Sequence, residues 1–327
     1  MSEHTRDCTS GTRRRNALKI PVQRVDSFQQ RHRSLGVTVA VFRKFGEDRS
    51  ANLASMLAFW AFFSIFPLLL VLVTLLGFLL PVSMKDRVLS SAATMLPLLD
   101  PATVQGLSGA WWALILGVVT ALWSGLRVVR VAQAALNSVW GLPFARHPTI
   151  VQQIVRGVAM LATVGVGLVV STLVNGYVSG AAAGIDLGWF GRLLGYLIAI
   201  ILDLGLFVAA FRLLTHRQVT TRDVLPGAAL CGVLFFVLQT ASSLIISRFL
   251  HTAQSTYGPF ATVITMLWWF YLQSVITLLG AQLNVVLKER LHPRALVAAP
   301  QTDADRRAYS AYAQVRTYHH DDEGFRS

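Results

Sequence analysis

The chain is poor in charged residues, since Asp, Glu, Lys and Arg make up 14% of its 327 residues while hydrophobic residues make up 54%. An ordinary soluble domain carries about 25% charged residues. The apolar residues are grouped in runs of about 20, the length of a membrane-spanning helix, rather than spread at the period of a surface helix or strand. These features exclude a typical soluble globule and predict a polytopic helical membrane protein.

Cysteine is nearly absent. Cys8 lies in a polar amino-terminal stretch and Cys231 lies inside an apolar run, so the two are not expected to share the geometry of a disulfide. His319 and His320 are too isolated from other ligand residues to form a metal site. We therefore expect no disulfide, no metal site and no cofactor.

Several catalytic motifs are also missing. The sequence contains no G-x-x-x-x-G-K-[ST] nucleotide loop, no H-E-x-x-H zinc motif and no G-x-S-x-G nucleophile motif. The first 50 residues show no pattern of a cleaved secretory signal, so the first membrane span is expected to direct insertion. The sequence does not predict an enzyme.

Six apolar stretches are long enough to cross a bilayer as helices. The predicted fold is an all-α membrane protein with six transmembrane helices inside a membrane domain over 54–287. The predicted spans are 57–80, 110–126, 157–180, 189–211, 224–250 and 260–287. The second span is short, and the apolar residues after Arg130 predict that its helix continues to Trp140.

Basic residues alternate between the segments that separate the spans. Eleven, four, three and seven Lys and Arg residues lie in alternate segments, and only four of the 29 lie in the others. The positive-inside rule then places both termini in the cytoplasm. This predicts a multi-pass topology with both ends of the chain on the same side of the membrane.

The predicted spans are flanked by two polar regions. Residues 1–53 form a basic arm in which Val37, Val41 and Phe45 recur at helical spacing, which predicts an interfacial amphipathic helix. A nucleic-acid-binding arm is the alternative, but juxtamembrane basic residues more often meet anionic lipid, so no nucleic acid is expected. The tail over 288–327 mixes basic and acidic residues and is expected to be disordered.

Three polar side chains lie near the middle of successive predicted spans: Asp203, Gln239 and Gln273. An ionisable residue inside a bilayer is costly and often functional. The three could line a substrate or proton site, or they could form polar contacts between helices.

Arg127, Arg130 and Asn137 share one face of a helix that leaves the membrane on the cytoplasmic side. Such a face could hold an anionic headgroup. The alternative is that the arginines only anchor the helix at the membrane boundary.

Short motifs give the chain a more specific resemblance. They are 43–48 (RKFGED) with 58–68 (AFWAFFSIFPL); 122–124 (LWS) with 135–141 (ALNSVWG); 225–228 (LPGA); and 257–260 (YGPF) with 279–284 (LGAQLN). In order and spacing, these motifs resemble the YihY/virulence factor BrkB family of bacterial inner-membrane proteins over about residues 35 to 290. The positions that carry the resemblance include Pro67, Trp123, Asn137, Gly258, Gly280, Gln282 and Asn284. Pro67 also predicts a kink in the first span.

The resemblance implies six helices and cytoplasmic termini, in agreement with the charge distribution. Members of the family have carried a ribonuclease label, but this chain lacks a His-x-His-x-Asp-His cluster that could activate water for phosphodiester cleavage. Other members are linked to serum resistance or envelope phenotypes. The chain departs from the family at Gln282, where Glu is often found.

The leading hypothesis is a transporter or flippase of an anionic lipid or amphiphile. The alternative is a membrane scaffold that binds envelope proteins without transport, and ribonuclease activity is not expected. Membrane lipids are the expected partners, and assembly with further copies of the same chain is left open.

Overall fold

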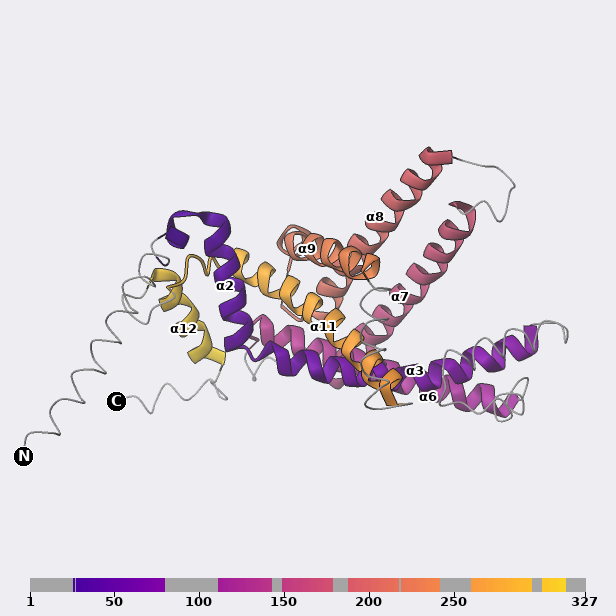
Figure 1. Cartoon of the computed structure of the whole chain (residues 1–327). Helices are drawn as coiled ribbons and strands as arrows, with labels where there is room; N and C mark the ends of the chain where they lie inside the picture. The colour runs from indigo at the N-terminus through magenta and orange to yellow at the C-terminus, as the bar shows by residue number, and fades with distance from the viewer. Residues whose placement is uncertain are drawn as a thin grey trace, which may run out of the picture.

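The computed structural model describes residues 26, 28–79, 111–142, 149–178, 188–217, 219–241, 260–295 and 302–315. Every regular element over these residues is a helix (Figure 1). The eight helices labelled there are α2 (Arg33–Glu47), α3 (Ser50–Leu79), α6 (Trp111–Val139), α7 (Ile150–Val178), α8 (Gly188–Leu214), α9 (Thr221–Thr240), α11 (Phe260–Lys288) and α12 (Asp303–Val315). The all-helical prediction is confirmed for the described residues.

Five of these helices are long and apolar enough to cross a membrane. They are α3, α6, α7, α9 and α11, and they overlap five of the six predicted spans. Helix α8 covers the predicted span 189–211, the fourth along the chain, but is not among the five, so this span stays a prediction. The prediction that the second helix continues past Arg130 is confirmed, since α6 ends at Val139.

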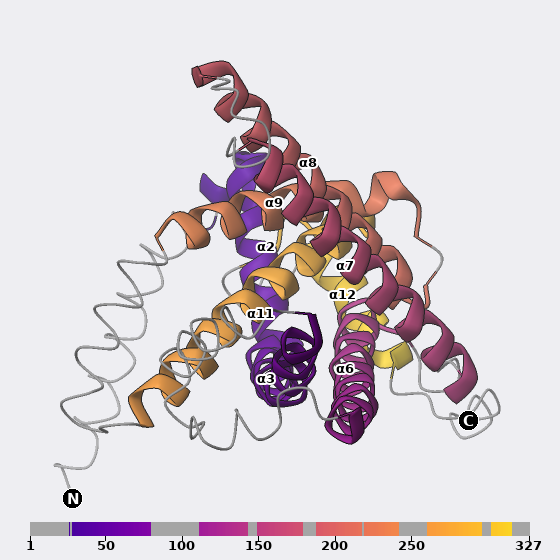
Figure 2. The same ribbon diagram turned by 90° about the vertical axis from the view of Figure 1, so that its right-hand side faces the viewer.

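The long helices pack in neighbouring pairs. Helix α3 packs against α6, and α7 packs against α8, while α11 contacts α3, α6 and α9. Figures 1 and 2 show the α3–α6 pair and the α7–α8 pair diverging from a common region, near which α2 and α12 lie.

The core is concentrated where the helices converge. Its fully buried side chains come from the end of α6, the end of α8, the start of α9 and the second half of α11, and they include Val139, Phe211, Val224 and Leu278. The first half of α6 and the stretch 56–68 of α3 instead expose large apolar side chains. In water such faces would be costly, but a bilayer is an apolar solvent for them.

The sequence also sets where helices begin and end. Gly141 follows α6 with φ 62°, and the backbone N–H of Leu142 donates to the carbonyl oxygen of Asn137 at 3.0 Å, which terminates the helix in the left-handed manner that favours glycine. At the start of α9, the carboxylate of Asp223 accepts the backbone N–H of Thr220 at 2.8 Å and supplies a helix cap.

The region after Lys288 differs from the disorder expected over 288–327. Residues 303–315 form helix α12, and Arg294 is completely buried. The reason is that charged residues of this segment pair with α2, a contact that composition alone does not reveal. Residues 296–301 and 316–327 lie outside the described part of the chain.

The amphipathic helix predicted in the amino-terminal arm is present as α2. Its inward side is covered by protein: Val41 is buried, Val37 and Phe45 pack on the core, and the helix contacts α11. This differs from the expected insertion of that face into lipid, and the position of α2 relative to a membrane stays a prediction.

Helices α9 and α11 approach each other closely where they cross. The centre of this crossing is formed by Gly227 and Gly280, and the side-chain oxygen of Asn284 accepts the backbone N–H of Gly227 at 2.6 Å. A Cβ atom on Gly227 would lie 2.5 Å from side-chain atoms of Asn284 and would overlap the carbonyl oxygen of Gly280. The two backbones can approach this closely only because neither residue has a side chain.

Replacing Gly227 by alanine should therefore force α9 and α11 apart. We expect Gly227→Ala to destabilise the protein by about 1–3 kcal/mol, the usual cost of overpacking a tight core. The thermal unfolding midpoint in detergent measures the effect. Gly232→Ala on the same helix is the matched control, because a Cβ there meets nothing within 4 Å. Equal midpoints for the two variants would contradict the close crossing.

Candidate functional site

The predicted headgroup-binding arginine Arg127 is exposed and lies against two indoles. Its guanidinium carbon is 5.2 Å from the ring centre of Trp60 on α3 and 5.9 Å from that of Trp123 on α6. Trp123 is itself exposed, and the two indole rings meet edge to face at 6.4 Å. Cation–π contacts hold such a guanidinium in place without neutralising its charge. The chain therefore presents a positioned cation on the outer surface of the α3–α6 pair.

Arg130 and Asn137 have different surroundings from Arg127. Arg130 is partly buried, and its Nε atom has no hydrogen-bond partner among the described residues. Asn137 is buried, and its side-chain oxygen accepts the backbone N–H of His216 at 2.9 Å. Asn137 therefore fixes the connection between α8 and α9. A contact of all three residues with one headgroup stays a prediction.

The three mid-span polar residues lie on α8, α9 and α11. At 1.5 Å per residue, Asp203 is about 17 Å from the end of α8 at Leu214, Gln239 is about 27 Å from the start of α9, and Gln273 is about 23 Å from the end of α11. Asp203 and Gln273 are partly buried, and Gln239 is exposed. Among the described side chains, no hydrogen bond joins any two of the three. A polar layer shared by these residues stays a prediction.

Gln282 is completely buried in a polar cluster with Asp48, Ser50, Lys44 and Tyr312. Its side-chain nitrogen donates to the Asp48 carboxylate at 2.8 Å and to the Ser50 hydroxyl oxygen at 2.9 Å. The same carboxylate accepts hydrogen bonds from the Lys44 ammonium and from the Tyr312 hydroxyl. Gln282 is therefore a neutral donor to a carboxylate that is already paired.

The ionisation of this cluster reflects its burial. Burial lowers the pKa of Lys44, and the attraction of Asp48 opposes that shift. Burial also raises the pKa of Tyr312, and the negative charges of Asp48 and Glu47 add to the effect. A neutral tyrosine hydroxyl can then keep donating to Asp48 across the ordinary pH range.

A second ionic cluster attaches the carboxy-terminal segment to α2. The completely buried Arg294 donates to both carboxylate oxygens of Glu47, at 2.6 and 3.0 Å, and to Asp305 on α12 at 3.1 Å. Burial alone would raise the pKa of Asp305, but hydrogen bonds from Ala295, Thr302 and Arg294 hold that pKa below its usual value. The carboxylate is therefore kept ionised beside its arginine.

The family-motif positions have distinct structural roles. Gly280 and Asn284 form the α9–α11 crossing, Gln282 bonds to Asp48, and Pro67 lies partly buried inside α3. Gly258 lies outside the described residues. Sequence reasoning did not single out Arg294, Asp305 or Tyr312. The sequence marks these residues only as charged and aromatic members of the polar segment 288–327.

The long apolar helices define a multi-pass membrane protein. The clusters around Gln282 and Arg294 lie at the end where these helices converge. Within the described ranges, no group of three or more His, Cys, Asp or Glu residues could hold a metal ion. The chain belongs to the virulence factor BrkB family, whose sequence model matches residues 41–305.

Individual relatives carry two kinds of name. The putative ribonuclease-like protein YfkH of Bacillus subtilis is 28% identical over 259 residues, which cover 75% of this chain and 91% of that protein. A UPF0761 membrane protein of Idiomarina loihiensis is 30% identical, with 47% of this chain and 54% of that protein covered. Another, from an Azoarcus strain, is 26% identical, with 78% and 64% covered. No solved structure matches the chain.

Neutralising Arg294 should release α12, because Glu47 and Asp305 would keep only Arg43 of the two arginines that pair with both of them. Breaking a buried ion pair by removing one partner costs about 3–5 kcal/mol. We expect Arg294→Gln to make Tyr309 and Tyr312 much more susceptible to limited chymotrypsin digestion. The control is Arg306→Gln, since Arg306 lies on α12 and its side chain is exposed. Unchanged digestion of Arg294→Gln would show that the ionic cluster does not hold α12 in place.

Introducing glutamate at position 282 should make stability depend on pH. A second carboxylate next to Asp48 raises the pKa of the pair, because two like charges cannot both ionise at low cost. The folded Gln282→Glu protein then binds more protons than the unfolded chain, so its stability is highest in acid and is lost as the pH rises through the raised pKa. We expect the unfolding midpoint to fall further below wild type at pH 8 than at pH 5.

The double variant Gln282→Glu/Asp48→Asn is the control for this effect. It keeps one carboxylate beside Lys44, so its midpoint should vary with pH much as in the wild type. If the unfolding midpoint of Gln282→Glu matches that of the wild type at both pH values, repulsion between carboxylates at positions 48 and 282 is excluded.

Proposed function

We propose that this membrane protein moves an anionic lipid or amphiphile between the leaflets of the bacterial inner membrane. The observation that supports the proposal is Arg127, whose exposed guanidinium lies against Trp60 and Trp123. In the described part of the chain, no carboxylate forms an ion pair with it. A positioned, uncompensated cation beside apolar helices attracts an anionic headgroup whose tails remain in lipid.

The location of Arg127 along its helix fits this role. It lies 16 residues after Trp111, or about 24 Å along α6, which is close to the thickness of a bilayer core. Together with the predicted cytoplasmic termini, this distance supports a location of the cation near the cytoplasmic boundary. An anionic lipid of the inner leaflet would meet Arg127 first, and Asp203 would act deeper in the membrane during its movement.

The test is transbilayer movement of labelled phosphatidylglycerol in proteoliposomes. We expect wild-type protein to accelerate the movement over empty vesicles, Arg127→Gln to slow it at least about fivefold, and Arg127→Lys to retain most of it, because the attraction is largely electrostatic. Asp203→Asn should also slow the lipid movement, because the proposed path passes this carboxylate. Labelled phosphatidylcholine tests whether the headgroup charge matters.

No movement above empty vesicles with wild-type protein would reject lipid transport and favour a scaffold. One observation supports that second function. Phe59, Phe63 and Phe66 form an exposed aromatic row along α3, at the spacing with which one helix face meets a partner helix. Cross-linking from these positions to a stoichiometric membrane partner would then be the decisive observation.

A further inference from the structure

A cavity lies at the end of the molecule where the long helices converge. Its volume is about 630 Å³, and it is lined by the end of α2, the end of α6, the α8–α9 connection, the end of α11 and one side of α12. Pockets for small ligands and cofactors usually measure about 300–1,000 Å³. Arg127 is not among the lining residues, so the cavity is separate from the proposed lipid contact.

The acidic residues of the cavity wall are all neutralised. Asp48 pairs with Lys44, and Glu289 pairs with Arg217 at 2.8 Å. Glu47 pairs with Arg294, which lies behind the wall. None of these carboxylates is therefore left to attract a cation.

Two lining arginines remain without a carboxylate partner in the described ranges. Arg49, between α2 and α3, is exposed, and no described hydrogen bond involves its guanidinium. Its backbone has φ 51°, a left-handed conformation that costs a non-glycine residue about 1–2 kcal/mol. Arg307 on α12 donates one hydrogen bond, to the backbone carbonyl oxygen of Arg290 at 2.7 Å. The cavity wall therefore carries an uncompensated positive charge from two separate elements.

The wall also contains a buried donor without an acceptor. Trp140, at the end of α6, is 2% exposed, and its indole nitrogen has no hydrogen-bond partner within the described structure. The guanidinium of Arg217 lies 5.9 Å from the centre of its ring. A buried N–H group left unpaired costs about 1–3 kcal/mol, which an oxygen-rich ligand could recover after a small shift of the side chains that shield it.

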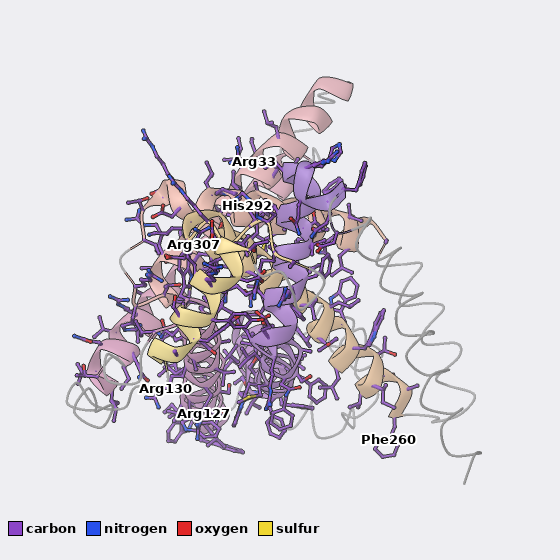
Figure 3. All side chains as sticks on the ribbon, turned by 90° about the vertical axis from the view of Figure 1, so that its left-hand side faces the viewer. Arg33, Arg127, Arg130, Phe260, His292 and Arg307 are labelled. Atoms are coloured by element: carbon purple, nitrogen blue, oxygen red, sulfur yellow. The ribbon has the colours of Figure 1, made fainter. Side chains whose placement is uncertain are left out.

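The surroundings of Arg307 are positive as well. Figure 3 labels Arg307 on α12 near His292 and Arg33. Burial lowers the pKa of His292, and the charges of Arg33 and Arg307 lower it further. The positive potential therefore extends beyond the cavity wall at this side.

We propose that this cavity is a binding site for a phosphate monoester, with Arg49 and Arg307 as the charged contacts and the Trp140 indole N–H as a neutral donor. A phosphate offers several strong acceptor oxygens and a charge of about −1.5 to −2 at neutral pH, which matches two free guanidinium groups and a free N–H. Because the site joins α12 to the ends of α2 and α6, the ligand stabilises the docked position of α12. The proposal does not depend on lipid transport.

The phosphate can belong to a soluble solute or to a lipid headgroup, and the experiment separates these sources. The full-length protein is placed in phosphatidylcholine nanodiscs, and its unfolding midpoint is followed with increasing inorganic phosphate against chloride at equal ionic strength. A second set of nanodiscs contains phosphatidic acid without added phosphate. A ligand that binds only the folded state raises the midpoint.

We expect a phosphate-dependent rise in the wild type. Arg49→Gln and Arg307→Gln should each weaken apparent affinity about tenfold, the usual effect of losing one charge-assisted hydrogen bond. Trp140→Phe should weaken it less, because only a neutral donor is lost. Arg306→Gln, next to Arg307 but outside the cavity wall, should behave as wild type. Chymotrypsin resistance of α12 confirms that each variant is folded.

A variant-sensitive rise with inorganic phosphate identifies a soluble ligand, and one seen only with phosphatidic acid identifies a lipid headgroup; both support the site. Equal midpoints in phosphate and chloride, together with no effect of phosphatidic acid, would overturn it. A rise that persists unchanged in Arg49→Gln and Arg307→Gln would also overturn it, because binding would then occur elsewhere. We expect Arg49→Gln to transport lipid at the wild-type rate, because Arg49 is not part of the Arg127 contact. The failure of one proposal can then be told from the failure of the other.

Discussion

The close crossing of α9 and α11 is the contact on which the rest of the structure depends. Gly227 and Gly280 let the two backbones meet, and Asn284 reaches from α11 to the backbone of α9. Helix α11 also contacts α2, α3 and α6, so its position sets theirs. In a bilayer, where apolar burial gives helices little reason to associate, close packing at small residues and a buried hydrogen bond supply the specificity.

The same helix carries the structure from the apolar spans to a charged layer. Gln282 lies two residues beyond Gly280 and donates to Asp48 at the end of α2. From there, the ionic contacts of Glu47 continue through Arg294 to Asp305 on α12. Buried charges carry a large desolvation penalty, so this layer holds together only because each described carboxylate in it has several donors. Helices α2 and α12 are thereby held against the membrane helices.

Two environments for an anion result from this architecture, and they differ in solvent. Arg127 is exposed beside two indoles on the surface of apolar helices, where a charged headgroup could meet it from the lipid. The cavity lies instead between the polar helices, where two guanidinium groups and one indole N–H have no anionic partner among the described residues. The first suits an amphiphile, and the second suits a compact phosphate group.

The sequence by itself determined the long apolar helices, because a run of about 20 apolar residues must satisfy its backbone hydrogen bonds internally in a bilayer. It also predicted the extension of α6 and the motif positions that place the chain in its family. It did not reveal the folding of α12, because the composition of a tail does not show which distant charge will pair with it. Only the tertiary structure joined Gln282 to Asp48 across 234 positions and Arg294 to Glu47 across 247. Such contacts depend on the relative placement of whole helices, which local apolar patterns leave undefined.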